Sequence, residues 1–157
     1  MRLYLLLALI YDGVLVTVCL YALVRGGRPE RVGAILTLIA SIVTVALRWS
    51  GFVRGEPAEI VMMAVDASVL GGFFWLAIRT TRFWPIWAFG FALADIVISI
   101  AGALLPKTPF IPYHTGLGIY AYLALAGLAI GTYRLPRDAT PDQRRGHRPP
   151  WKSPTQT

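Results

Sequence analysis

Three carboxylates lie inside long apolar stretches of the sequence. Asp12, Asp66 and Asp95 each stand in a run that contains no lysine or arginine. A carboxylate at the centre of a membrane span costs about 2.5 to 3.5 kcal/mol if it faces lipid, so we expect all three to point into a helical bundle. Intramembrane carboxylates are also typical of routes for protons and cations.

Three interpretations of these carboxylates remain open. Each can be a neutral or hydrogen-bonded group that fixes the register of its helix, since burial penalises the charged form. Together they can form a proton or cation path, or they can line a pocket for a ligand. We predict no cofactor and no metal site, because the chain has one cysteine and its two histidines lie outside the apolar runs. A bound lipid or pigment stays an open alternative.

Asp66 has one candidate partner in the preceding apolar run. Arg48 stands at the outer end of that run, and the short connector predicts that the two segments pack antiparallel. A guanidinium can extend along a helix, so Arg48 can reach Asp66, with Arg54 as the alternative donor. We therefore predict an Arg48–Asp66 ion pair, and a protonated Asp95. A stripe of small and hydroxyl residues ends at Arg48: Gly33, Thr37, Ser41 and Thr44.

Five apolar segments carry these residues, at residues 3–24, 32–47, 60–78, 84–105 and 115–133. A helix needs about 20 residues to cross the hydrocarbon core of a membrane. The composition agrees, because 56% of the residues are hydrophobic and only 15% are charged. We predict an all-α polytopic membrane bundle of five transmembrane helices over residues 1–133. Four helices plus a re-entrant second segment is the alternative, since that segment is the shortest.

Small residues recur on one face of the fourth and fifth segments. Ala88 and Ala92 share a helix face with Asp95, and Gly127 and Gly131 form a GxxxG pair. Such residues let two helix backbones approach closely, so we predict helix packing at these positions. The pattern leaves open whether the GxxxG pair packs within the chain or against another chain.

Lysine and arginine are divided unevenly between the two sides of this bundle. One side carries only Arg2, Arg48, Arg54 and Lys107, and the other carries all the remaining ones, from Arg25 to Lys152. Because loops rich in these residues stay in the cytoplasm, we predict a multi-pass protein of the bacterial inner membrane with its N-terminus outside and its C-terminus inside. Aromatic residues expected at the inner interface are Phe83, Trp84 and Trp87.

The composition changes at residues 134–157, which are rich in proline and basic residues. We predict a disordered cytoplasmic tail there. Its basic cluster follows a membrane helix and is expected to meet anionic lipid headgroups, with docking to a protein as the alternative. This cluster consists of Arg144, Arg145, Arg148 and Lys152. Nucleic acid is not a predicted partner, although the chain has a formal net charge of +7.

Motifs of known catalytic sites are missing from the sequence, which has no phosphate-binding glycine loop, no HExxH and no nucleophile elbow. We therefore predict that the protein is not an enzyme. Small-residue faces and a basic tail favour an accessory or structural subunit of a larger membrane complex, or a homo-oligomer. The alternative is a small proton- or cation-coupled transporter that uses Asp12, Asp66 and Asp95.

A pattern of residues spread mainly over 28–133 provides one further indication. It consists of Glu59, Val65-Asp66-Ala67, Arg82-Phe83-Trp84-Pro85, Trp87, Gly90-Phe91, Tyr120 and Gly131-Thr132. This pattern resembles a group of small uncharacterised bacterial inner-membrane proteins. The resemblance implies a helical membrane protein and brings no activity that could be transferred.

Overall fold

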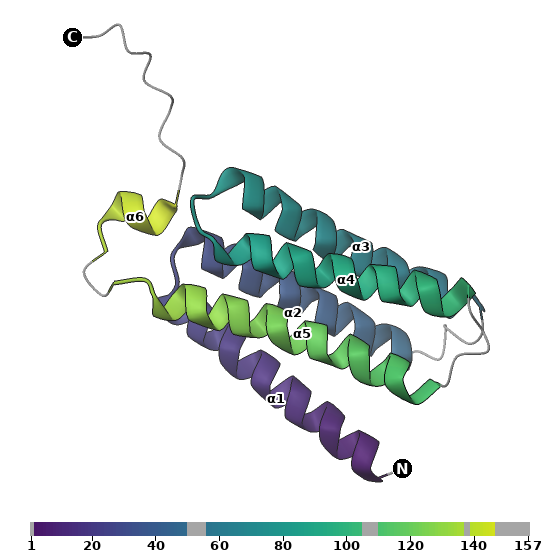
Figure 1. The fold of residues 1–157 in the computed structure, drawn as a ribbon. Helices are drawn as coiled ribbons and strands as arrows, with labels where there is room; N and C mark the ends of the chain where they lie inside the picture. Colours follow the sequence, from purple (N-terminus) through teal and green to yellow (C-terminus); the bar gives the residue numbers. More distant parts are fainter. Residues whose placement is uncertain (1, 50–55, 105–109, 137–138, 147–157) are drawn as a thin grey trace, which may run out of the picture.

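A computed structural model describes residues 2–49, 56–104, 110–136 and 139–146 (Figure 1). Within these ranges, the side chains of residues 2–5, 7, 8, 48, 56–59, 102–104 and 110–118 are not described. The described residues form six helices and no strand, which confirms the all-α prediction. The helices are α1 (Arg2–Arg25), α2 (Arg28–Trp49), α3 (Glu56–Arg79), α4 (Trp84–Leu104), α5 (Phe110–Tyr133) and α6 (Pro141–Arg145).

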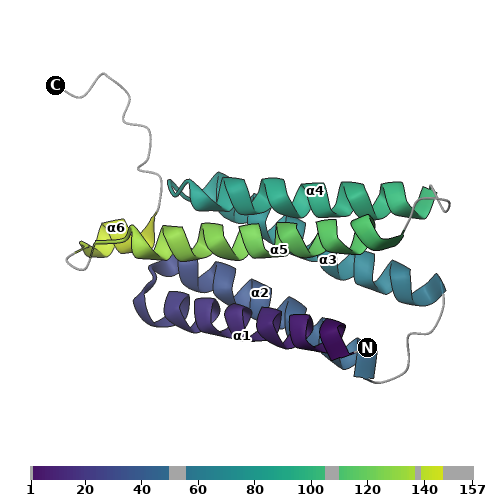
Figure 2. The same cartoon turned by 60° about the horizontal axis from the view of Figure 1, so that its bottom comes forward.

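The five long helices run side by side and close into a ring (Figures 1 and 2). From α1 to α5, each helix packs against the next one in the chain, and α5 packs against α1 to complete the ring. Helix α2 also touches α5 across the ring. The short helix α6 lies beyond the end at which α1 passes into α2 and α3 passes into α4. We call this the α6 end of the bundle. Because the ring is closed, residues from all five long helices can face one interior space.

Three helices in the described part of the chain are long and apolar enough to cross a membrane. They cover Arg28–Leu47, Ile60–Arg79 and Trp84–Ala101. Each leaves large apolar side chains exposed, such as Ile42, Ile60 and Val97, an arrangement that suits a lipid environment. The protein is therefore a helical membrane protein. The second segment, for which a re-entrant course was the alternative, is a continuous helix and one of these three.

Helices α2, α3 and α5 begin four or five residues earlier than the sequence predicted, and the early start of α2 matters for the interior of the bundle. The sequence predicted a helix from residue 32, whereas α2 begins at Arg28. Pro29 is tolerated there because the first turn of a helix has no internal partner for its backbone N–H groups, and Glu30 suits the positive end of the helix dipole. This difference brings Glu30 into the bundle.

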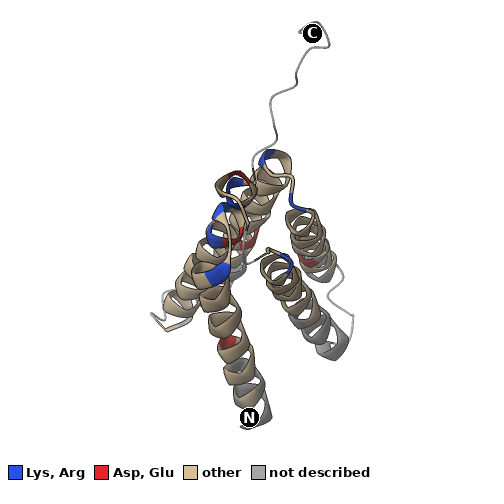
Figure 3. Cartoon of the chain, turned by 90° about the vertical axis from the view of Figure 1, so that its left-hand side faces the viewer, with Lys and Arg blue, Asp and Glu red and all other residues tan. Residues whose placement is uncertain are grey.

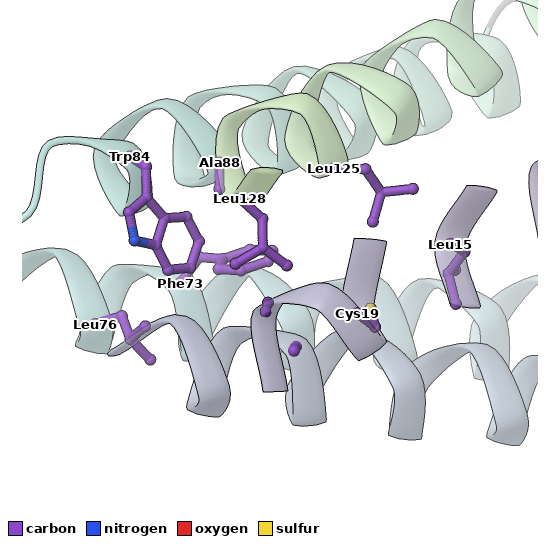
Figure 4. Close-up of a cluster of buried hydrophobic side chains, with 10 residues drawn as sticks. Leu15, Cys19, Phe73, Leu76, Trp84, Ala88, Leu125 and Leu128 are labelled. Atoms are coloured by element: carbon purple, nitrogen blue, oxygen red, sulfur yellow. The ribbon is translucent and has the colours of Figure 1, made fainter. Parts of the chain in front are cut away.

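A compact apolar cluster fills the bundle toward the α6 end (Figure 4). Its buried members are Leu15, Cys19, Ala22, Ala34, Phe73, Leu76, Trp84, Ala88, Leu125 and Leu128. Trp84 is the largest of them and is 0% exposed. Trp84 therefore points into the bundle and not toward lipid, whereas Phe83 and Trp87 are 43% and 59% exposed. That all three lie at the inner membrane interface stays a prediction.

Two glycines explain why the indole of Trp84 fits inside. A Cβ atom at Gly33 of α2 or at Gly131 of α5 would overlap the indole, so neither position has room for a side chain. A Cβ at Gly127 would lie 3.9 Å from the carbonyl oxygen of Trp84. The GxxxG pair of α5 therefore faces the start of α4 within the same chain. On α4 itself, Ala88 is buried and Ala92 is half-buried.

The segment predicted as a disordered tail contains the ordered helix α6. The hydroxyl of Thr140 accepts from the backbone N–H of Gln143, and the Gln143 side chain accepts from the N–H of Thr140. This reciprocal capping, and the left-handed Gly146 at the other end (φ 60°), stabilise one helical turn despite the polar composition. The prediction of disorder is thus wrong for residues 139–146, while Arg148 and Lys152 lie outside the described residues.

Candidate functional site: a carboxylate-lined cavity

A cavity of about 380 Å³ lies inside the ring of helices, and all three intramembrane carboxylates line it. Asp12 comes from α1, Asp66 from α3 and Asp95 from α4. Asp66 and Asp95 are half-buried, whereas Asp12 is exposed and so lies where the cavity meets the surface. Asp12 and Asp95, which are 83 positions apart in the sequence, thus face a common space.

Hydroxyl groups complete the polar part of the cavity wall. Thr37, Ser41 and Thr44 line it from α2, as the stripe in the sequence predicts, and the wall also includes Tyr11 and Tyr120. The hydroxyl of Thr37 donates to the carbonyl oxygen of Gly33 (2.9 Å), so its oxygen lone pairs remain available to the cavity. Carboxyl and hydroxyl oxygens together can accept and pass on protons or coordinate a hard cation.

The rest of the wall is apolar and partly aromatic, and includes Phe73, Phe91 and Leu128. No lysine or arginine is among the described residues that line the cavity. Each carboxyl group there is therefore either protonated or compensated by a bound cation or by a basic residue outside this set. An apolar wall with a few polar groups is typical of sites for small molecules.

The three carboxylates do not converge on one point. The described residues contain no group of three or more His, Cys, Asp or Glu side chains placed to hold a metal ion. The three aspartates therefore line one cavity from three helices without forming a metal-type cluster among the described residues.

The structure describes only the backbone of Arg48, the predicted partner of Asp66. Arg48 belongs to the last turn of α2, but its side chain lies outside the described residues. The Arg48–Asp66 ion pair, with its alternative donor Arg54, stays a prediction.

A second polar cluster, at the α6 end, was missed by the sequence analysis. Glu30 is 0% exposed, and its Oε1 accepts a hydrogen bond from Nε1 of Trp84 (3.2 Å). The same oxygen lies 3.5 Å from Nε of Arg82. Among the described residues, neither Glu30 Oε2 nor Arg82 Nε has a hydrogen-bond partner. The sequence signal was the Pro29-Glu30 pair, which is typical of a helix start, but burial of Glu30 follows only from the packing.

Trp84 separates this buried carboxylate from the cavity. Phe73 lines the cavity and meets Trp84 edge to face, with ring centroids 6.2 Å apart and an interplanar angle of 83° (Figure 4). Along α2 the order is Glu30, then Gly33 against the indole, then Thr37 on the cavity wall. Glu30 therefore lies on the far side of the apolar cluster from the three aspartates.

Fold and cavity together define the class: a helical membrane protein whose bundle encloses a space lined by acidic residues. Comparison with protein-family models, with curated proteins and with solved protein structures finds no match for this chain. The resemblance to small bacterial inner-membrane proteins stays an expectation, and the function has to be argued from the cavity itself.

Proposed function

We propose that this protein is a small proton- or cation-coupled transporter in which Asp12, Asp66 and Asp95 carry the coupling ion. The proposal rests on one observation, which is that carboxylates from three different helices line the same cavity. Ionisable residues in membrane spans are costly, and they are typical of ion and proton pathways. A volume of about 380 Å³ also lies within the range of about 300 to 1,000 Å³ that is usual for small-molecule sites.

The proposal includes five membrane spans. Helices α1 and α5 have 24 residues each, and at 1.5 Å per residue each is about 36 Å long, more than the roughly 30 Å of a hydrocarbon core. Arginines gather at the α6 end, where they include Arg25, Arg28, Arg79 and Arg134 (Figure 3). We propose that this end faces the cytoplasm of a bacterium, and that the protein lies in the inner membrane.

Flux into proteoliposomes tests the proposal. Purified protein is reconstituted into vesicles that contain a pH-sensitive dye, and a potassium diffusion potential is imposed with an ionophore, in the presence and absence of external Na⁺. We expect the wild type to acidify or alkalinise the vesicles faster than protein-free vesicles. Asp66→Asn and Asp95→Asn should reduce this rate to the protein-free level, because amides neither ionise nor carry protons.

Asp142→Asn is the matched control. Asp142 lies on α6 with a 94% exposed side chain, away from the cavity, so its replacement should leave the flux unchanged. Equal rates in the wild type, the cavity variants and protein-free vesicles would refute the transport proposal.

An accessory subunit or homo-oligomer is the second candidate, and a groove on the outer face of α1 favours it. The groove is lined by Ile10, Gly13, Val14, Thr17 and Val18, and a Cβ at Gly13 would have no neighbour within 4 Å among the described residues. A helix of a second chain can pack closely on such a surface. Crosslinking in membranes should then capture a partner or a second copy, and Gly13→Leu should abolish the crosslink.

A further inference from the structure

We propose that α6 is a latch that keeps the cavity closed at the α6 end. Trp84 and Phe73 close this end of the cavity, and we call them the cavity floor. Arg82 and Glu30 connect α6 to this floor. The purpose of this latch rests on the transport function proposed above, because a transporter must open its site to one side at a time. The structural coupling can be tested without any substrate.

The first contact joins α6 to the connector between α3 and α4. Nη2 of Arg82 donates to the carbonyl oxygen of Gln143 (2.8 Å), and the backbone N–H of Thr81 donates to the carbonyl oxygen of Gly146 (3.1 Å). Both acceptors lie at the C-terminal side of α6, where helix carbonyls have no partner within the helix. Gly146 also packs against Pro29 at the start of α2. The latch therefore touches the connector between α3 and α4 and the first turn of α2.

The second contact joins Arg82 to Glu30. Glu30 is fully buried, whereas the side chain of Arg82 is 21% exposed, and Nε of Arg82 stands 3.5 Å from Oε1 of Glu30 without a hydrogen bond between them. A buried ion pair whose two members are not hydrogen-bonded to each other recovers little of the cost of removing its charges from water. We infer that the pair does not close this end by its own strength. Arg82 is held over Glu30 because its Nη2 donates to the carbonyl oxygen of Gln143 in α6.

The third contact joins Glu30 to Trp84, which packs against Phe73 of the cavity wall. Oε1 of Glu30 accepts from the indole of Trp84, and that indole meets the ring of Phe73 on the cavity wall. A Cβ at Gly33 or at Gly131 would overlap the indole, so α2 and α5 pack directly against Trp84. Opening a route past Trp84 therefore requires the ends of α2 and α4 to separate. Arg82 and α6 oppose that separation while α6 is docked.

Chemical modification of Cys19 can report when water reaches the apolar cluster around Trp84. Cys19 is the only cysteine of the chain, is 0% exposed, and belongs to the same apolar cluster as Trp84. A small water-soluble methanethiosulfonate should modify Cys19 slowly in the closed protein and faster once water enters the cluster. Release of α6 is measured separately as tryptic cleavage after Arg145, because a protease needs the helix to detach and unfold locally.

Two variants release α6 by different means. Gly146→Val places a β-branched residue at a φ of 60° at the end of α6 and crowds Pro29 in the first turn of α2. Arg82→Gln removes the donor to Gln143. In inside-out membrane vesicles we expect each to raise both cleavage and Cys19 modification by about five- to thirtyfold, the change that a shift of one or two kcal/mol gives. Matched controls are Gly71→Val, where a Cβ would have no neighbour within 4 Å in the described part of the chain, and Arg79→Gln, whose arginine lies over Trp75.

Each outcome decides the proposal. Increased cleavage with unchanged Cys19 modification would overturn it, because α6 would then detach without opening the cluster. Cleavage that stays at the wild-type rate in both variants would overturn it too, since the contacts named here would not hold α6. A failure of the transport proposal looks different, namely no flux in any protein while cleavage and Cys19 modification still rise together.

Discussion

Nε1 of Trp84 donates a hydrogen bond of 3.2 Å to Oε1 of Glu30, across 54 positions of the sequence, and both side chains are fully buried. The bond joins the first turn of α4 to the first turn of α2. A carboxylate without exposure must find its partners inside the protein, and an indole offers a single donor in a fixed direction. The register between α2 and α4 is thus set by a polar contact embedded in an apolar cluster.

Replacing Trp84 by Phe should lower the free energy of unfolding in detergent by about 1 to 3 kcal/mol, because Glu30 then loses its hydrogen-bond donor while most of the apolar contact remains. Trp87→Phe is the control, since Trp87 is 59% exposed, and it should change stability by less than about 0.5 kcal/mol. Thermal or denaturant unfolding followed by circular dichroism measures both. Equal effects of the two substitutions would contradict the role of the Trp84–Glu30 bond.

Gly33→Ala and Gly131→Ala should each destabilise the bundle by about 1 to 3 kcal/mol, because the added methyl group overlaps the indole of Trp84. Gly71→Ala and Gly90→Ala are the matched controls, since a Cβ at either position would have no described atom within 4 Å. These controls should be neutral or slightly stabilising, by up to about 1 kcal/mol, because alanine favours a helix. Unfolding in one detergent ranks all four, and an inverted order would refute the close packing around Trp84.

A double-mutant cycle tests the predicted Arg48–Asp66 pair. If the pair is buried, Arg48→Gln alone should cost roughly 3 to 5 kcal/mol by leaving an unpaired charge, and adding Asp66→Asn should restore much of that loss. The measurement is the unfolding free energy of the wild type, the two single variants and the double variant. Small effects that simply add would mean that Asp66 has no such partner and is free for a proton path.

Reporter fusions test the proposed orientation. A reporter that is active only in the cytoplasm should work when fused after Thr157, and one that is active only outside should work when inserted at Lys107, between α4 and α5. The expectation follows from the concentration of arginine at the α6 end. The opposite pattern would place Arg25 and Arg134 outside and refute the orientation.

The sequence by itself determined the class of the protein and the candidate polar groups. Long apolar runs predict helices because a backbone in lipid must satisfy its own hydrogen bonds, and three such helices are found among the described residues. The sequence also singled out Asp12, Asp66 and Asp95, since charged residues in apolar runs need no knowledge of the fold to be recognised. Helical periodicity placed Thr37, Ser41 and Thr44 on one face, and all three line the cavity.

Only the tertiary structure decided which of these groups share a space and which residues enclose it. Glu30 and Trp84 stand at helix starts, and both are buried because Gly33 and Gly131 leave room for the indole that covers Glu30. Composition likewise predicted disorder for a segment that contains a capped helix and docks on the bundle through Arg82. Periodicity reports the face of one helix, but contact between helices depends on the volumes and donors that several of them bring together, and that information is not local in the sequence.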